Sequence, residues 1–133
     1  MLYLVYGCSM NPIMKQKILL VDDEKDMRLL IKCLLQPQGY EIAEAENGQE
    51  ALDILEKDLA PDLILLDHNM PIMDGPNFLK VVEKKYPQIF AKVPIVLLTA
   101  TASHEMPNTK AAEVVLKPVN LGTLLSLVAK YLH

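Results

Sequence analysis

The sequence predicts an α/β fold, a five-stranded parallel sheet that is doubly wound, with helices on both faces in a three-layer αβα sandwich. From Lys17 onward, strand-like and helix-like segments alternate with short connections, which is typical of such sheets. Two of the apolar runs, Lys17–Val21 and Leu63–Leu66, show no polar alternation, which indicates strands covered on both faces. The 133 residues suffice for one domain, and with no Trp its core must be mainly aliphatic.

The first half of the chain predicts three strands and two helices. After the strand Lys17–Val21, apolar residues recur at helical spacing and form one stripe: Met27, Leu30, Ile31 and Leu34. Breaker residues at 36–39 end that helix, and Tyr40–Ala45 alternates as a less buried strand would. A turn at Asn47-Gly48 then opens a second helix, whose apolar face is Ala51, Leu52, Ile54 and Leu55, before the strand Leu63–Leu66.

The second half predicts two more strands and a weak segment between them. Pro76 suits the first turn of a helix that faces inward through Phe78, Leu79 and Val82. Strands are expected at Val93–Leu98 and Val114–Leu116, and Asn120 can cap a last helix that buries Leu121, Leu124, Leu125 and Val128. Between the strands, Ser103–Ala112 contains Pro107 and few apolar residues, so the fourth helix should be short or irregular.

Residues 1–15 are interpreted as an extension outside the core, and 16–133 as the domain; an extra edge strand near the N-terminus is the alternative. No Lys or Arg precedes Lys15, so the extension does not resemble a signal peptide, and its apolar run is too short to span a membrane. A net charge of −4 argues against direct nucleic-acid binding. Cys8 and Cys33 lack metal-ligand spacing, which favours free thiols in a cytoplasmic protein.

Functional side chains are expected where the strands end, because ligands of open α/β sheets bind outside the carboxyl ends of the strands. These ends carry Asp22 and Asp23, Asp67, Thr99, and Lys117. Neighbouring carboxylates repel by about 4 kcal/mol per pair at 4 Å in an effective dielectric of 20. A divalent cation would relieve that repulsion, and oxygen ligands with an open face suit Mg²⁺ beside a phosphate. Asp67 stands alone at its strand end and is the natural nucleophile for an aspartyl phosphate.

These residues resemble the receiver domain of two-component response regulators, the CheY-like superfamily, from Lys17 to Leu132. The matching segments are 21–24, 65–71 with 73–75, 98–100, and 116–118. Each segment alone is unspecific, whereas all of them in order, each at a strand end, form a strong pattern. The resemblance implies a flavodoxin-like strand order of 2-1-3-4-5.

The resemblance also implies the role of each acidic residue. Asp67 would accept a phosphoryl group from a phosphohistidine of a sensor histidine kinase or a histidine phosphotransfer protein. Asp23 and Asp67 would ligate one Mg²⁺ directly, the backbone carbonyl of Asn69 would be a third ligand, and Asp22 would act through water. The domain would thus be a signalling module that catalyses its own phosphorylation and dephosphorylation, and not an enzyme in the usual sense.

The resemblance also implies roles for residues at the ends of the fourth and fifth strands. Lys117 would contact the phosphoryl group, and Thr99 would swing to bond it and thereby change the protein contacts of the face that these two strands form. The Lys117–Pro118 peptide bond is expected to be cis. The side chains of Asn69 and Thr101 would tune how fast the phosphoryl group is lost.

Two features depart from the family pattern. Val114 occupies a position that is usually aromatic and that takes part in the switch, and the segment around Pro107 is compressed. Both changes fall on the face that receivers use for dimerisation and partner binding. His68 is interpreted as a solvent-facing residue and not as a ligand or an acid, and His104 and His133 have no evident partner.

The expected partners are the kinase or phosphotransfer protein and a downstream protein or fused domain, with a phosphorylation-dependent homodimer as a further possibility and no direct contact with nucleic acid or membrane. The chain ends at His133, which fits either a stand-alone receiver or one excised from a longer protein. A pseudo-receiver that binds partners without phosphorylation is the main alternative. A phosphatase with Asp67 as nucleophile is disfavoured, because Asn69 stands where a second acid would be needed.

Overall fold

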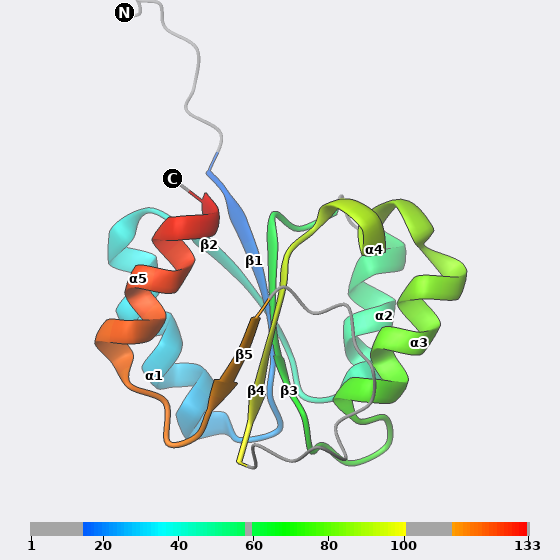
Figure 1. Ribbon diagram of the computed structural model, residues 1–133, viewed down its shortest axis with the longest axis horizontal. Helices are drawn as coiled ribbons and strands as arrows, with labels where there is room; N and C mark the ends of the chain where they lie inside the picture. Colours follow the sequence, from blue (N-terminus) through cyan, green and yellow to red (C-terminus); the bar gives the residue numbers. More distant parts are fainter. Residues whose placement is uncertain (1–14, 58–59, 101–112, 133) are drawn as a thin grey trace, which may run out of the picture.

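The five strands form one parallel sheet in the order β2-β1-β3-β4-β5, with helices on both faces (Figure 1). The computed structural model describes residues 15–57, 60–100 and 113–132. The predicted fold class and strand order are both confirmed. In the described part of the chain, no helix has the length and apolar character needed to cross a membrane.

The elements lie close to the predicted ranges. The strands are β1 (Lys17–Val21), β2 (Glu41–Ala45), β3 (Leu63–Asp67), β4 (Ile95–Thr99) and β5 (Glu113–Leu116). The helices are α1 (Lys25–Leu35), the 3₁₀ turn η1 (Gln36–Gln38), α2 (Gly48–Lys57), α3 (Gly75–Lys85), α4 (Pro87–Lys92) and α5 (Leu121–Leu132).

Helix α4 was not predicted. A residue that precedes a proline avoids helical backbone angles, and Tyr86, before Pro87, has φ −129° and ψ 62°. Helix α3 therefore ends at Lys85, and Pro87 begins a separate short helix. The irregular helix predicted over Ser103–Ala112 lies outside the described residues.

The core has two halves, one on each face of the sheet. Because successive strand residues point to opposite faces, Ile18 and Leu20 of β1 face helices α1 and α5, whereas Leu19 and Val21 face α2 and α3. Figure 1 shows the same division, with α1 and α5 to one side of the sheet and α2, α3 and α4 to the other. Strands β3 and β4 are buried along their whole length, which the unbroken apolar run Leu63–Leu66 predicted for β3.

The buried face of α1 differs from the prediction. The helix buries Arg28, Ile31 and Leu35, whereas Leu30, predicted to be inside, is 46% exposed. Arg28 shares the buried face of the helix with Ile31 and Leu35, and its side chain donates to the backbone carbonyl of Asp22 at 2.6 Å.

The parallel register brings the carboxyl ends of the strands to one edge of the sheet. Val21 of β1 pairs with Leu66 of β3, and Thr99 of β4 pairs with Leu116 of β5. The residues that directly follow β1 and β5 therefore lie near the last residues of β3 and β4. In Figure 1 this edge lies at the bottom of the sheet.

Candidate functional site

Three aspartates meet at the carboxyl edge of the sheet. One carboxylate oxygen from each of Asp22, Asp23 and Asp67 lies within 4.8 Å of the others. Asp22 and Asp67 are buried and Asp23 is exposed. Asp23 and Asp67 border a cleft of about 310 Å³, whose lining also includes Glu24, Asn69, Ala100 and Lys117. The cleft is therefore acidic on one side and carries a lysine on the other.

Asp22 is fixed by hydrogen bonds at nearly every polar atom. Its backbone N–H donates to the carbonyl of Ala45 in β2 at 3.0 Å, and its own carbonyl accepts from Arg28. Its Oδ1 atom accepts from the backbone N–H of Glu24 at 2.8 Å. Its Oδ2 atom is buried and accepts no hydrogen bond from any residue that the structure describes. Burial raises the pKa of this carboxyl group, although the Glu24 hydrogen bond opposes the rise.

Asp67 is paired with Lys117 across the cleft. The Lys117 Nζ atom lies 2.9 Å from Oδ1 of Asp67 and 3.9 Å from Oδ2 of Asp22. Burial raises the pKa of Asp67 to about 6; the Lys117 hydrogen bond opposes the rise, and the charge of Asp22 adds to it. Burial also disfavours the charged form of Lys117, yet its pKa is raised because the Asp67 carboxylate stabilises the ammonium group. Lys117 thus lies close to two of the three carboxyl groups of the cluster.

The residues at this edge fit a small divalent cation. The Oδ2 atom of Asp22 is a buried acceptor without a hydrogen bond among the described residues, and it belongs to a cluster of three carboxylates. Such an arrangement is costly unless a positive charge compensates it. The donors are all oxygen and one side of the site is open, which suits Mg²⁺ better than a soft metal.

The remaining predicted site residues lie on both sides of this cleft. Thr99 ends β4 and is buried, and its backbone carbonyl accepts from the N–H of Lys117 at 2.7 Å. Asn69 is exposed and lines the cleft. The Lys117–Pro118 bond is cis. Val114 lies on β5 and is 44% exposed. Thr101, Pro107, His104, His133 and Cys8 lie outside the described residues, whereas Cys33 is a free, exposed thiol.

The interpretation of His68 as solvent-facing holds only in part. The residue is partly buried, and its Nε2 atom is buried without a hydrogen-bond partner in the described part of the chain. Its Nδ1 atom lies 3.1 Å from Oδ1 of Asn69. The backbone explains the position: the His68 N–H donates to Leu98 and its carbonyl accepts from Gly75, so that residue 68 continues the sheet edge.

Gly75 is a further residue at this edge, and the sequence pattern alone gave it no role beyond a turn. A Cβ atom there would lie 2.7 Å from the backbone oxygen of Asp67, so only glycine fits between α3 and the end of β3. Gly75→Ala is expected to cost about 1–3 kcal/mol of unfolding free energy, because the backbone that carries Asp67 must shift. Urea unfolding checks this, with Gly122→Ala as the matched control in α5, where a Cβ atom would meet only an Asn120 side-chain oxygen at 3.3 Å. A loss in Gly75→Ala no larger than in the control would contradict the prediction.

Comparison with known proteins adds independent information. A family model described as the response regulator receiver domain matches residues 18–129. The chain is 35% identical to the chemotaxis protein CheY of Bacillus subtilis over 125 residues, which are 90% of this chain and 100% of that protein. It is 34% identical to sporulation initiation phosphotransferase F of the same organism over 123 residues, with coverage of 90% and 95%.

Solved structures agree with the sequence matches. The response regulator protein TrrA from Thermotoga maritima, whose crystal structure contains Mg(2+)-BeF, superimposes with a TM-score of 0.75 at 38% identity. The superposition covers 88% of this chain and 99% of that one. Sequence and structure comparisons thus point to the same family and cover similar shares of this chain, 90% and 88%.

Proposed function

The chain belongs to the response regulator receiver domain family of two-component signalling, and on that premise we propose that it accepts a phosphoryl group on Asp67. The donor is a phosphohistidine of a sensor histidine kinase or a histidine phosphotransfer protein. The observation that supports this most is the Asp67–Lys117 pair beside a buried aspartate whose Oδ2 atom has no described hydrogen-bond donor. The domain, residues 16–133, acts in the cytoplasm as a signalling module and catalyses only its own phosphorylation and dephosphorylation.

In the proposed reaction, the carboxylate of Asp67 is the nucleophile. One of its oxygens attacks phosphorus, a P–O bond forms as the P–N bond breaks, and the electron pair of that bond goes to the imidazole nitrogen, which takes up a proton from solvent. Because the pKa of Asp67 is about 6, most of the carboxyl groups are ionised and nucleophilic above pH 7. Lys117, 2.9 Å from Asp67, is in place to bind an oxygen of the incoming phosphoryl group.

One Mg²⁺, held by Asp23, Asp67 and the backbone carbonyl of Asn69, with Asp22 acting through water, would neutralise charge on the phosphoryl oxygens. Hydrogen bonds to the backbone and the Oδ1 atom of Asp22 hold the turn that carries Asp22 and Asp23. The turn therefore keeps these carboxylates at the site before any ligand arrives. The Mg(2+)-BeF bound in the Thermotoga maritima structure supports this assignment, and so does the resemblance to a Bacillus subtilis protein that is named a phosphotransferase.

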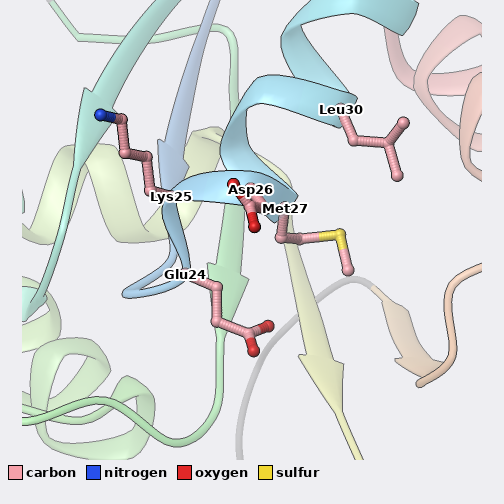
Figure 2. A pocket seen from close by; sticks show the side chains of 5 residues that line it. All are labelled: Glu24, Lys25, Asp26, Met27 and Leu30. Carbon is pink, nitrogen blue, oxygen red and sulfur yellow. The ribbon is translucent and has the colours of Figure 1, made fainter.

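A groove next to the cleft suits the docking of the protein that carries the phosphohistidine. It measures about 500 Å³ and is lined by Glu24, Lys25, Asp26, Met27 and Leu30. Figure 2 shows the side chains of Met27 and Leu30 extending to the same side of α1, whereas that of Lys25 points away from them. The groove shares Glu24 with the cleft around Asp67. A donor protein that brings its imidazole to Asp67 must cover this rim, and the exposed side chain of Leu30 gives it an apolar contact.

The proposed output involves the strand-four and strand-five face. Thr99 moves toward the phosphoryl group, Asn69 and Thr101 tune the rate of its loss, and the change reaches β5 through the hydrogen bond from Lys117 to the Thr99 carbonyl. With Val114 on β5, no aromatic side chain takes part at this position. A downstream protein, a fused domain or a second copy of this chain binds the changed β4 and β5 face.

Beryllofluoride, a non-covalent mimic of the phosphoryl group, tests this function. With Mg²⁺ and beryllofluoride, NMR spectra of the wild type should shift at residues around the cleft and at β4 and β5, whereas those of Asp67→Asn should not. Wild-type spectra that do not change would contradict the proposal and would favour a pseudo-receiver that works without phosphorylation.

A further inference from the structure

We propose that Arg28 is a positioning residue for the divalent-cation site, an inference that rests on the proposed function. Arg28 is 8% exposed, although arginine is almost never buried without partners. Its Nη1 atom donates to the backbone carbonyl of Asp22 at 2.6 Å, and its Nε atom lies 3.1 Å from Oε1 of Glu44. It therefore joins α1, the strand β2 and the turn that carries the acidic residues.

The hydrogen bond from Arg28 fixes a peptide plane. The carbonyl of Asp22 belongs to the peptide group that leads into Asp23, and that group is planar and rigid. When Arg28 holds the oxygen of this group, it also fixes the direction in which the chain enters Asp23. Asp23 is exposed and lacks the burial that restrains Asp22 and Asp67, so the orientation of its backbone decides whether its carboxylate stays at the cleft.

The guanidinium is itself held by a network on β2. Glu44 accepts from Arg28 through Oε1 and from Lys32 through Oε2 at 2.7 Å. The hydrogen bond from Lys32 is the main reason why the pKa of Glu44 is lowered; burial opposes the shift and Arg28 adds to it. Glu44 is thus ionised at neutral pH. Its hydrogen bond with Nε of Arg28 orients the guanidinium so that Nη1 can donate to the carbonyl of Asp22.

A positioning role of Arg28 and a purely electrostatic role of its charge predict opposite changes in Mg²⁺ affinity when Arg28 is replaced. A cation near a metal site repels the metal, so the loss of the Arg28 charge alone would make Mg²⁺ bind more tightly. If Arg28 positions Asp22 and Asp23, its loss makes Mg²⁺ bind more weakly instead. The sign of the change therefore separates the two effects.

The test is a Mg²⁺ titration followed by NMR, together with urea unfolding of each variant. Arg28→Gln should weaken Mg²⁺ binding about tenfold, in the range seen when residues that orient metal ligands are removed. The Mg²⁺ affinity of Arg28→Lys should lie between those of Arg28→Gln and the wild type. Lysine keeps the charge but lacks the planar guanidinium that bonds Asp22 and Glu44 together. Lys32→Gln is the comparison variant: it removes the other cation that binds Glu44 but leaves the hydrogen bond from Arg28 to Asp22 in place, so its loss of Mg²⁺ affinity should be smaller than that of Arg28→Gln.

Arg28→Gln that folds and binds Mg²⁺ as tightly as the wild type, or more tightly, would overturn the inference while the proposed function stands. If Arg28→Gln does not fold, Arg28→Lys decides, and an affinity equal to that of the wild type would overturn the inference. If the wild type itself binds no Mg²⁺, the proposed metal site fails and the role of Arg28 fails with it.

Discussion

Asp67→Asn is expected to make the metal-free protein more stable at neutral pH, by about 1–3 kcal/mol. The folded-state pKa of Asp67 is about 6, against the 3.8 of an ordinary aspartate. Each unit of difference corresponds to about 1.4 kcal/mol, which places the upper end of the range near 3 kcal/mol. Asparagine has nearly the same shape, can still accept from Lys117, and carries no charge into the buried cluster.

The stability gained by Asp67→Asn should depend on pH. Because folding raises the pKa of Asp67, the stability that its carboxyl group contributes is fully present below about pH 4 and is lost as the pH rises through about 6. The stability difference between Asp67→Asn and wild type should therefore be near zero at pH 4 and reach its full value above pH 7. Urea unfolding in EDTA across this range measures it. A variant less stable than wild type at pH 7.5 would show that Lys117 compensates Asp67 fully.

Lys117→Met is expected to slow phosphorylation of Asp67 by about 10²–10³-fold, the usual cost of removing one group that stabilises a developing charge. The same change should leave Mg²⁺ affinity equal to or tighter than that of wild type, because it removes a cation 2.9 Å from one proposed ligand and 3.9 Å from another. Rates with acetyl phosphate and a Mg²⁺ titration measure the two effects separately.

Lys80→Met is the control for this variant, since Lys80 lies on the exposed face of α3 and should leave both quantities unchanged. Lys117→Arg should retain part of the rate, because it keeps the charge but changes the shape of the donor. If Lys117→Met were phosphorylated at the wild-type rate, Lys117 would have no role in transfer and its pairing with Asp67 would be structural only.

The sequence predicted the sheet well because its signal is local. Uninterrupted apolar runs such as Leu63–Leu66 have one stable environment in a domain of this size, and residues that end such runs must emerge at the carboxyl edge. That is why Asp22, Asp23 and Asp67 could be placed together from the sequence alone. The strand order, in contrast, came from the resemblance, since a pattern of apolar residues does not say which strands are neighbours.

The rest depends on contacts between distant residues. Helix α1 buries Arg28 beside Ile31 and Leu35, and the partners of Arg28, Asp22 and Glu44, come from the end of β1 and from β2. The position of His68 depends in the same way on backbone bonds to Leu98 and Gly75. Such polar contacts leave no periodic trace in the sequence, so neither the burial of Arg28 nor that of the His68 Nε2 atom could be predicted.

The most direct test of the central claim is the intact mass of the protein after incubation with acetyl phosphate and Mg²⁺. The wild type should gain the mass of one phosphoryl group, the adduct should map to Asp67, and EDTA or Asp67→Asn should each abolish it. A wild type that gains no mass, or an Asp67→Asn variant that gains as much as the wild type, would contradict the assignment of Asp67 as the phosphoryl acceptor.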